Sequence, residues 1–120
     1  MTTHDRRHTD DVIDALDVLT RALERARGEI DAALRRAAIL RRQRAAGMGY
    51  ARILSEAERP LIVESVTTVL ASLSDAGSRF RRAQARAVYA EGLSMEMIGR
   101  LLGVSRQRVS SLVRRPERVG

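Results

Sequence analysis

The feature that most constrains the fold is an unbroken heptad pattern in the first third of the chain. From Val12 to Leu40, the apolar positions are separated by alternating steps of four and three residues. Such steps align all of the positions along one stripe of an α-helix, whereas a β-strand shows alternation at every second residue. The pattern predicts one long helix that extends to Ala46. The members of this seam are Val12, Leu16, Leu19, Leu23, Ala26, Ile30, Ala33, Ala37 and Leu40.

The apolar stripe is wider than the seam, because residues such as Ile13 and Leu34 flank it. A wide stripe favours a bundle of helices over an isolated two-stranded coil. The seam could be buried against a second copy of the chain, or against the apolar positions of residues 61–73 in the same chain. Both arrangements agree with the pattern, and the dimer is the one that we expect.

The residues before the seam are polar. Thr9 or Asp10 is placed to cap the long helix, so residues 1–9 are predicted to form a disordered tail. His4 and His8 lie four residues apart, a spacing that can bind a metal on a helix, but no third ligand accompanies them. We therefore interpret both histidines as part of the tail.

Three further helices are predicted in the middle of the chain. After Gly47 and Gly49 a short helix is expected over residues 50–57, followed by a longer one over residues 60–75. The β-branched residues of the longer segment also permit a strand, but no partner strand is evident. The segment Ser74-Asp75-Ala76-Gly77 is expected to end that helix, and Ser78 to cap the next one.

The net charge of +7 is confined to the last part of the chain. All 22 basic residues are arginine, and residues 1–75 contain 12 of them beside 12 acids. Residues 76–120 contain 10 arginines and only 3 acids. A neutral part joined to a basic part suggests an association region followed by a region that binds a polyanion.

Composition excludes several classes of function. Without cysteine, neither a disulfide framework nor a thiolate metal site is possible. The scarcity of aromatic residues argues against a surface for stacking single-stranded bases. The apolar run Leu61–Leu73 is interrupted by polar residues and is shorter than the roughly 20 residues that cross a bilayer. We expect a cytoplasmic, nucleoid-associated protein with no membrane partner.

The strongest functional signal lies in residues 94–114. Ser94 and Ser105 are each placed to cap a helix, and Gly103 supplies the positive φ that a three-residue turn requires. Gly99 is small at the point where the two helices must cross closely. The residues expected to support these helices from inside are Ile98, Leu102, Val104, Val109, Leu112 and Val113.

The second helix of this segment keeps an outward side without any acid. Its arginines can pair with guanine O6 and N7, and its glutamine with adenine N6 and N7. Its first residues lie where a recognition helix meets the major groove. The outward residues are Arg106, Gln107, Arg108, Ser110, Ser111 and Arg114.

These residues carry a resemblance to a known family. The order Gly92-Leu93-Ser94, Ile98, Gly103-Val104-Ser105-Arg106 and Val109 resembles the bacterial helix-turn-helix superfamily. With a leading helix from Phe80, the segment is similar to the three-helix, homeodomain-like form of sigma-factor region 4, serine-recombinase C-terminal domains and small regulators. The family more often has alanine at position 99. The resemblance covers under a third of the chain and implies sequence-specific binding of double-stranded DNA.

The expected architecture is all-α. A helical dimerisation or bundle region, residues 10–76, precedes a three-helix helix-turn-helix domain, residues 78–116. The predicted base contacts are Arg106, Gln107, Ser110 and Ser111. The predicted phosphate contacts are Ser94, Ser105, Arg82, Arg86, Arg100, Arg108, Arg114 and Arg115, although the arginines could serve solubility alone. The predicted dimer contacts are Val12, Leu16, Leu19, Leu23, Ile30, Ile62, Val66, Val69 and Leu73.

The sequence therefore predicts a homodimeric transcriptional regulator that binds double-stranded DNA. One alternative is a nucleoid-type protein with little sequence preference. Another is a protein-interaction module, such as an antitoxin or a polymerase-associated factor, and a contact with RNA polymerase stays open. The chain has no G-x-S-x-G nucleophile motif and no glycine-rich phosphate loop, so we expect no enzyme, no cofactor and no metal.

Overall fold

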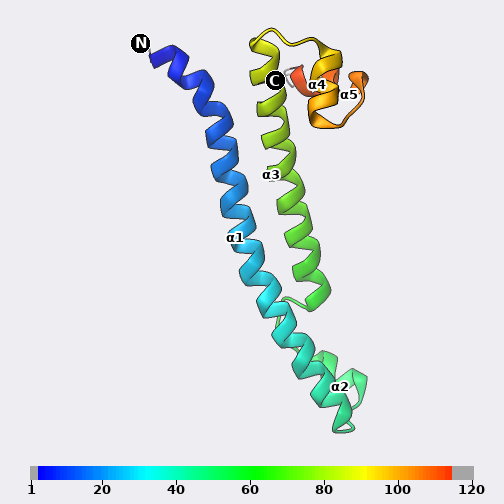
Figure 1. Cartoon of the computed structure of the whole chain (residues 1–120). Helices are drawn as coiled ribbons and strands as arrows, with labels where there is room; N and C mark the ends of the chain where they lie inside the picture. Colours follow the sequence, from blue (N-terminus) through cyan, green and yellow to red (C-terminus); the bar gives the residue numbers. More distant parts are fainter. Residues whose placement is uncertain (1–2, 115–120) are drawn as a thin grey trace, which may run out of the picture. The chain divides into compact units, whose positions relative to one another are not determined.

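The computed structural model describes residues 3–114, with side chains from residue 11 onward. Within these residues the chain forms five α-helices and no β-strand (Figure 1). The prediction of an all-α protein is confirmed for this part of the chain. No helix in it is long and apolar enough to cross a membrane. The helices are α1 (Thr3–Ala45), α2 (Tyr50–Glu56), α3 (Ile62–Ala90), α4 (Met95–Leu102) and α5 (Arg106–Val113).

The chain divides into two compact units. The hairpin unit is Thr20–Ser74, and the terminal unit combines Met1–Leu19 with Asp75–Gly120. Both α1 and α3 contribute to each unit, because each helix passes a boundary. The hairpin unit also holds α2, and the terminal unit also holds α4 and α5.

Helix α1 confirms the long helix that the seam predicts, but it begins earlier than expected. It starts at Thr3, so residues 3–9 are helical instead of forming the predicted tail, and neither Thr9 nor Asp10 begins the helix. No glycine or proline interrupts the chain before Gly28, so no residue opposes helix formation strongly there. At the other end, Gly47 adopts a φ of 88°, which ends the helix.

Helix α3 is one continuous helix, and the predicted break within it is wrong. Gly77, expected to separate two helices, lies inside the single helix Ile62–Ala90. A glycine inside a helix costs only about 1 kcal/mol relative to alanine. The neighbouring Ala76 is buried at 5 % exposure, and no proline lies within residues 62–90, so packing is sufficient to hold the helix together. The strand alternative for the first part of this segment is also wrong.

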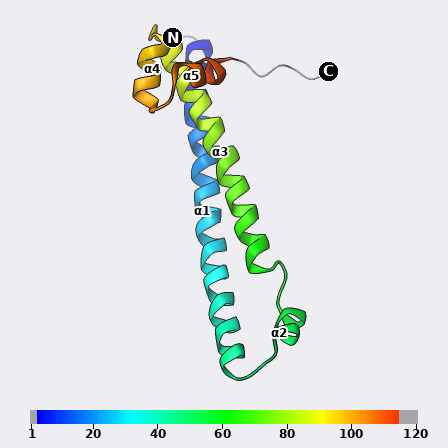
Figure 2. The same ribbon diagram turned by 90° about the vertical axis from the view of Figure 1, so that its right-hand side faces the viewer.

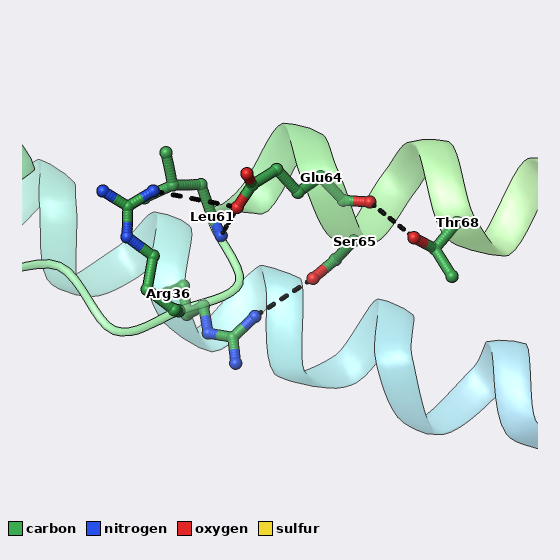
Figure 3. Close-up of polar contacts among 6 residues, drawn as sticks. Arg36, Leu61, Glu64, Ser65 and Thr68 are labelled. Carbon is green, nitrogen blue, oxygen red and sulfur yellow. Dashed lines mark hydrogen bonds and ion pairs between the residues drawn. The ribbon is translucent and has the colours of Figure 1, made fainter.

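In the hairpin unit, α1 and α3 lie side by side and run in opposite directions (Figure 1, Figure 2). The residues buried in this unit are small on both helices: Ala22 and Ala26 on α1, and Ser65 on α3. The guanidinium of Arg36 donates a hydrogen bond of 3.2 Å to Ser65 Oγ (Figure 3). Small side chains at the contact permit the two helices to approach closely.

Helix α2 confirms the predicted short helix. Ile53 is its buried residue, and the Arg44 guanidinium at the end of α1 lies 4.3 Å from the centroid of the Tyr50 ring. A cation over an aromatic face is attracted to it, so this contact ties the start of α2 to the end of α1.

The terminal unit has a core of larger side chains. Ala85 of α3, Ile98 of α4, and Val109 and Leu112 of α5 are all completely buried. Burial of a large apolar side chain stabilises by about 1.5–3 kcal/mol. This cluster therefore fixes α4 and α5 against the last turns of α3. The half-buried residues packed on it are Val88, Leu93, Met95, Leu102, Val104 and Val113.

Candidate nucleic-acid interface

Helix α4 begins and ends as the sequence predicts. The Met97 N–H donates to Ser94 Oγ at 3.2 Å, which caps the helix, and Gly103 ends it with φ 70° and ψ 34°. The turn brings the carbonyl of Val104 back onto the helix. A Cβ on Gly99 would lie 2.8 Å from that carbonyl oxygen, closer than side chains tolerate. Gly99 is thus required by the tight approach of the turn.

Helix α5 is capped and anchored in the same manner. The Arg108 N–H donates to Ser105 Oγ at 3.1 Å. Val109 and Leu112 are fully buried, and Val113 is half-buried beside them. Because these side chains fix the rotation of the helix about its axis, they decide which residues face solvent.

The side of α5 opposite Val109 is open. Gln107 and Ser111 are exposed there, and Arg106 at the first turn is exposed as well. Ser110, predicted as a base contact, is half-buried at the edge of this side. The helix carries no acidic residue. Three of the four predicted base contacts are therefore accessible together.

The other residues predicted at the phosphates fall into different situations. Arg108 and Arg114 are exposed on or directly after α5. Arg100 is exposed on α4 and lies 4.0 Å from Glu96 Oε2, a weak surface ion pair. The Ser94 and Ser105 side chains are exposed but already accept the capping hydrogen bonds. Arg115 lies outside the described residues.

Arg82 and Arg86 of α3 contact the end of α5. Both are half-buried. Arg82 donates to the carbonyl of Ser111 at 3.5 Å, and Arg86 donates to the carbonyl of Arg114 at 3.4 Å. Cations near the carboxyl end of a helix are favourable, because the last carbonyls are unpaired and carry partial negative charge. No local pattern in the sequence indicates this role, because 29 and 28 residues separate the partners.

The positive charge of this unit is local. Residues 75–114 contain eight arginines and three acids. The exposed acids Asp11, Asp14 and Asp17 of α1 belong to the same unit. The excess positive charge therefore belongs to α5 and the last part of α3. When the acids of α1 are included, the net positive charge of the whole unit is smaller.

Helix α4 also exposes an apolar pair. Met97 is 53 % and Leu101 66 % exposed, and their spacing of four residues places them on one side of the helix. Their spacing is visible in the sequence, but no sequence pattern assigns a role to these residues. Among the residues with described side chains, no group of histidine, aspartate or glutamate is arranged to hold a metal ion.

The predicted dimer contacts divide into two groups. The structure leaves four of them exposed and half-buries the other five within the chain. Exposed are Leu16, Leu23, Ile30 and Val66; half-buried are Val12, Leu19, Ile62, Val69 and Leu73.

Comparison of this chain with known protein families, with curated proteins and with solved structures gave no match.

Proposed function

We propose that α4, the turn that follows it and α5 form a helix-turn-helix that binds double-stranded DNA with sequence preference. The observation that carries the proposal is the composition of the solvent-exposed side of α5. This helix is capped by Ser105 and anchored by Val109 and Leu112, and its solvent side carries arginine and glutamine without any acid. A recognition helix needs this combination, because base readout requires donors and acceptors held in a fixed orientation.

The side chains divide into base-reading and backbone-binding groups. Arg106, Gln107 and Ser111 would contact base edges, where arginine pairs with guanine and glutamine with adenine. Arg108 and Arg114 would neutralise phosphates and supply most of the affinity, with a strong dependence on salt. Arg82 and Arg86 would act as positioning residues, since their guanidinium groups hold the end of α5.

The biological role that fits this site is a homodimeric transcriptional regulator. A single small module buries little surface, whereas two copies can read two half-sites about one helical turn apart. The exposed apolar residues Leu16, Leu23 and Ile30 on α1 support association with another copy.

The test is selection of bound sequences from random duplex DNA, followed by binding measurements on the best site and on unrelated DNA. Arg106→Ala should lose about 1–3 kcal/mol on the best site and relax the preference at one base position. Arg79→Ala, which removes an exposed arginine from α3, is the matched control. It should leave the ratio of specific to non-specific affinity unchanged.

Two results would contradict the proposal. If Arg106→Ala keeps the wild-type ratio, the base-reading role of this residue is wrong. If the wild-type chain selects no sequence, a nucleoid-type protein is the better interpretation. Failure to bind any DNA at low salt would instead favour the protein-interaction module.

A further inference from the structure

Only part of the heptad seam of α1 is buried within the hairpin unit. Ala26 is buried and Ala33 half-buried. Leu23 and Ile30, the seam members between them, are 52 % and 51 % exposed, and Leu34 beside them is 64 % exposed. The larger side chains of α1 are therefore turned away from the intramolecular contact.

Helix α3 shows the same division. Ser65 is buried and Val69 half-buried. Val63, Val66 and Leu70 are exposed at 74 %, 45 % and 61 %. This helix also keeps its small residue inside and leaves large apolar residues in water.

The two exposed stripes lie on one face of the hairpin unit. Successive residues of an α-helix advance by about 100°. On α1, Leu23 and Ile30 are rotated by roughly a quarter turn from the buried line of Ala22 and Ala26. On α3, Val66 is rotated by about the same angle, in the same sense, from the buried line that contains Ser65. Because the helices run in opposite directions, equal rotations bring both stripes to the same side.

We propose that this open face binds the same face of a second copy of the chain, forming a four-helix bundle. The open face consists of Leu23, Ile30 and Leu34 of α1 and Val63, Val66 and Leu70 of α3. The inference rests on the proposed function only for the expectation of a homodimer. The seam then packs in both ways: one half is buried within the chain, and the other half is buried between two chains.

Size and repetition identify a second copy as the occupant. The exposed apolar area of these six residues is on the order of several hundred Å², as large as the largest patches of monomeric proteins. A standard interface buries about 800 Å² per partner, and the six residues of this face alone would supply a large share of that area. The seven-residue spacing of Leu23 and Ile30 repeats along the helix, so two copies can pack along this face in a twofold arrangement.

Charges beside the open face favour an antiparallel arrangement of the two α1 helices. Glu24 and Asp31 directly follow Leu23 and Ile30, and so lie on one flank of the stripe. By helical spacing, Arg35 and Arg42 lie farther along the same flank.

An antiparallel pair brings the acidic part of one flank next to the basic part of the other. A parallel pair would place α1 of one copy opposite α3 of the other, because the twofold axis then runs along the helices, and the two flanks would not meet. The four flanking residues, Glu24, Asp31, Arg35 and Arg42, are all exposed.

The first experiment measures the mass of the full-length protein by sedimentation equilibrium. The wild type should be a dimer, and Ile30→Asp should raise the dimer Kd at least about 100-fold, because a carboxylate would have to enter an apolar interface. Leu101→Asp on α4 is the control, since this leucine is at least as exposed as Ile30 but lies outside the open face. This control should remain dimeric.

Val66→Asp tests the same face from α3 in case Ile30→Asp fails to fold, as judged by far-UV circular dichroism. A monomeric wild type, or dimers that survive both substitutions, would overturn the inference. A control that dissociates as readily as Ile30→Asp would overturn the assignment to this face.

The orientation is tested by reversing charges. E24R/D31R and R35E/R42E should each raise the dimer Kd about three- to tenfold, and a chain carrying all four changes should return to the wild-type value. A parallel dimer keeps the two flanks apart in every variant, so equal Kd values throughout would exclude the antiparallel arrangement.

DNA binding separates this inference from the proposed function. Folded Ile30→Asp should keep the base preference of the wild type while needing more protein to occupy two half-sites. If the wild type dimerises through the open face but shows no base preference, the proposed function fails and the interface stands. If it shows the preference and Ile30→Asp stays dimeric, the interface fails and the function stands.

Discussion

Two helical contacts in this chain bury side chains of different size. One is the core of α4 and α5, and the other is the contact between α1 and α3 in the hairpin unit. The first buries Ile98, Val109 and Leu112 completely. The second buries Ala22 and Ser65 and leaves most of its leucines and isoleucines exposed. Both are helical contacts within one small chain, yet only the first encloses its large side chains.

This difference indicates which contact is complete without a partner. Burial of each large side chain contributes about 1.5–3 kcal/mol, whereas an alanine contributes much less. The orientation of α5 therefore depends on contacts inside the chain. The stability of the hairpin unit is expected to depend on what covers its exposed side.

Leu112→Ala should have the largest effect. The side chain is fully buried, so its truncation should lower the free energy of unfolding by about 2–5 kcal/mol at any protein concentration. Ile30→Ala should matter mainly for association, so its effect on the free energy of unfolding should be largest where the wild type is dimeric and should vanish as the protein is diluted below the wild-type dimer Kd. Urea unfolding at several protein concentrations measures both. A concentration-dependent loss for Leu112→Ala would break the distinction.

The segment around α4 and α5 was predictable because its signals are local. Ser94, Gly103 and Ser105 each act on the backbone within a few residues, and the structure gives each of them the expected cap or positive φ. The capping residues and the apolar spacing together set the helix ends to within a residue.

Other parts were not predictable, because distant contacts decide them. Glycine disfavours a helix, but at Gly77 the packing around Ala76 keeps the helix continuous. Periodicity identifies the seam on α1, but it does not determine which residues of the seam are buried within the same chain. The contacts of Arg82 and Arg86 depend on how α5 returns to α3, which no local pattern encodes.

Two glycine substitutions sharpen the comparison, and each should change the free energy of unfolding by an intermediate amount. Gly99→Ala places a Cβ 2.8 Å from the Val104 carbonyl oxygen, and the backbone must shift, which should cost about 1–3 kcal/mol. Gly77→Ala meets no atom within 4 Å and should stabilise by about 0.5–1 kcal/mol through helix propensity. Thermal unfolding of both variants checks the signs. Equal effects would mean that the turn after α4 is looser than this geometry requires.

Ser105→Ala should have the smallest destabilising effect. It removes the acceptor of the Arg108 N–H, so the first turn of α5 loses about 1 kcal/mol of capping stabilisation. Ser74→Ala, an exposed serine inside α3, is the control and should cost nothing, since alanine is the better helix former.

Amide hydrogen exchange at the start of α5 measures the loss of the cap directly. Because the buried Val109 and Leu112 still hold the helix, exchange should rise only in its first turn. A faster exchange over the whole of α5 would show that the cap, and not the core beneath it, orients this helix.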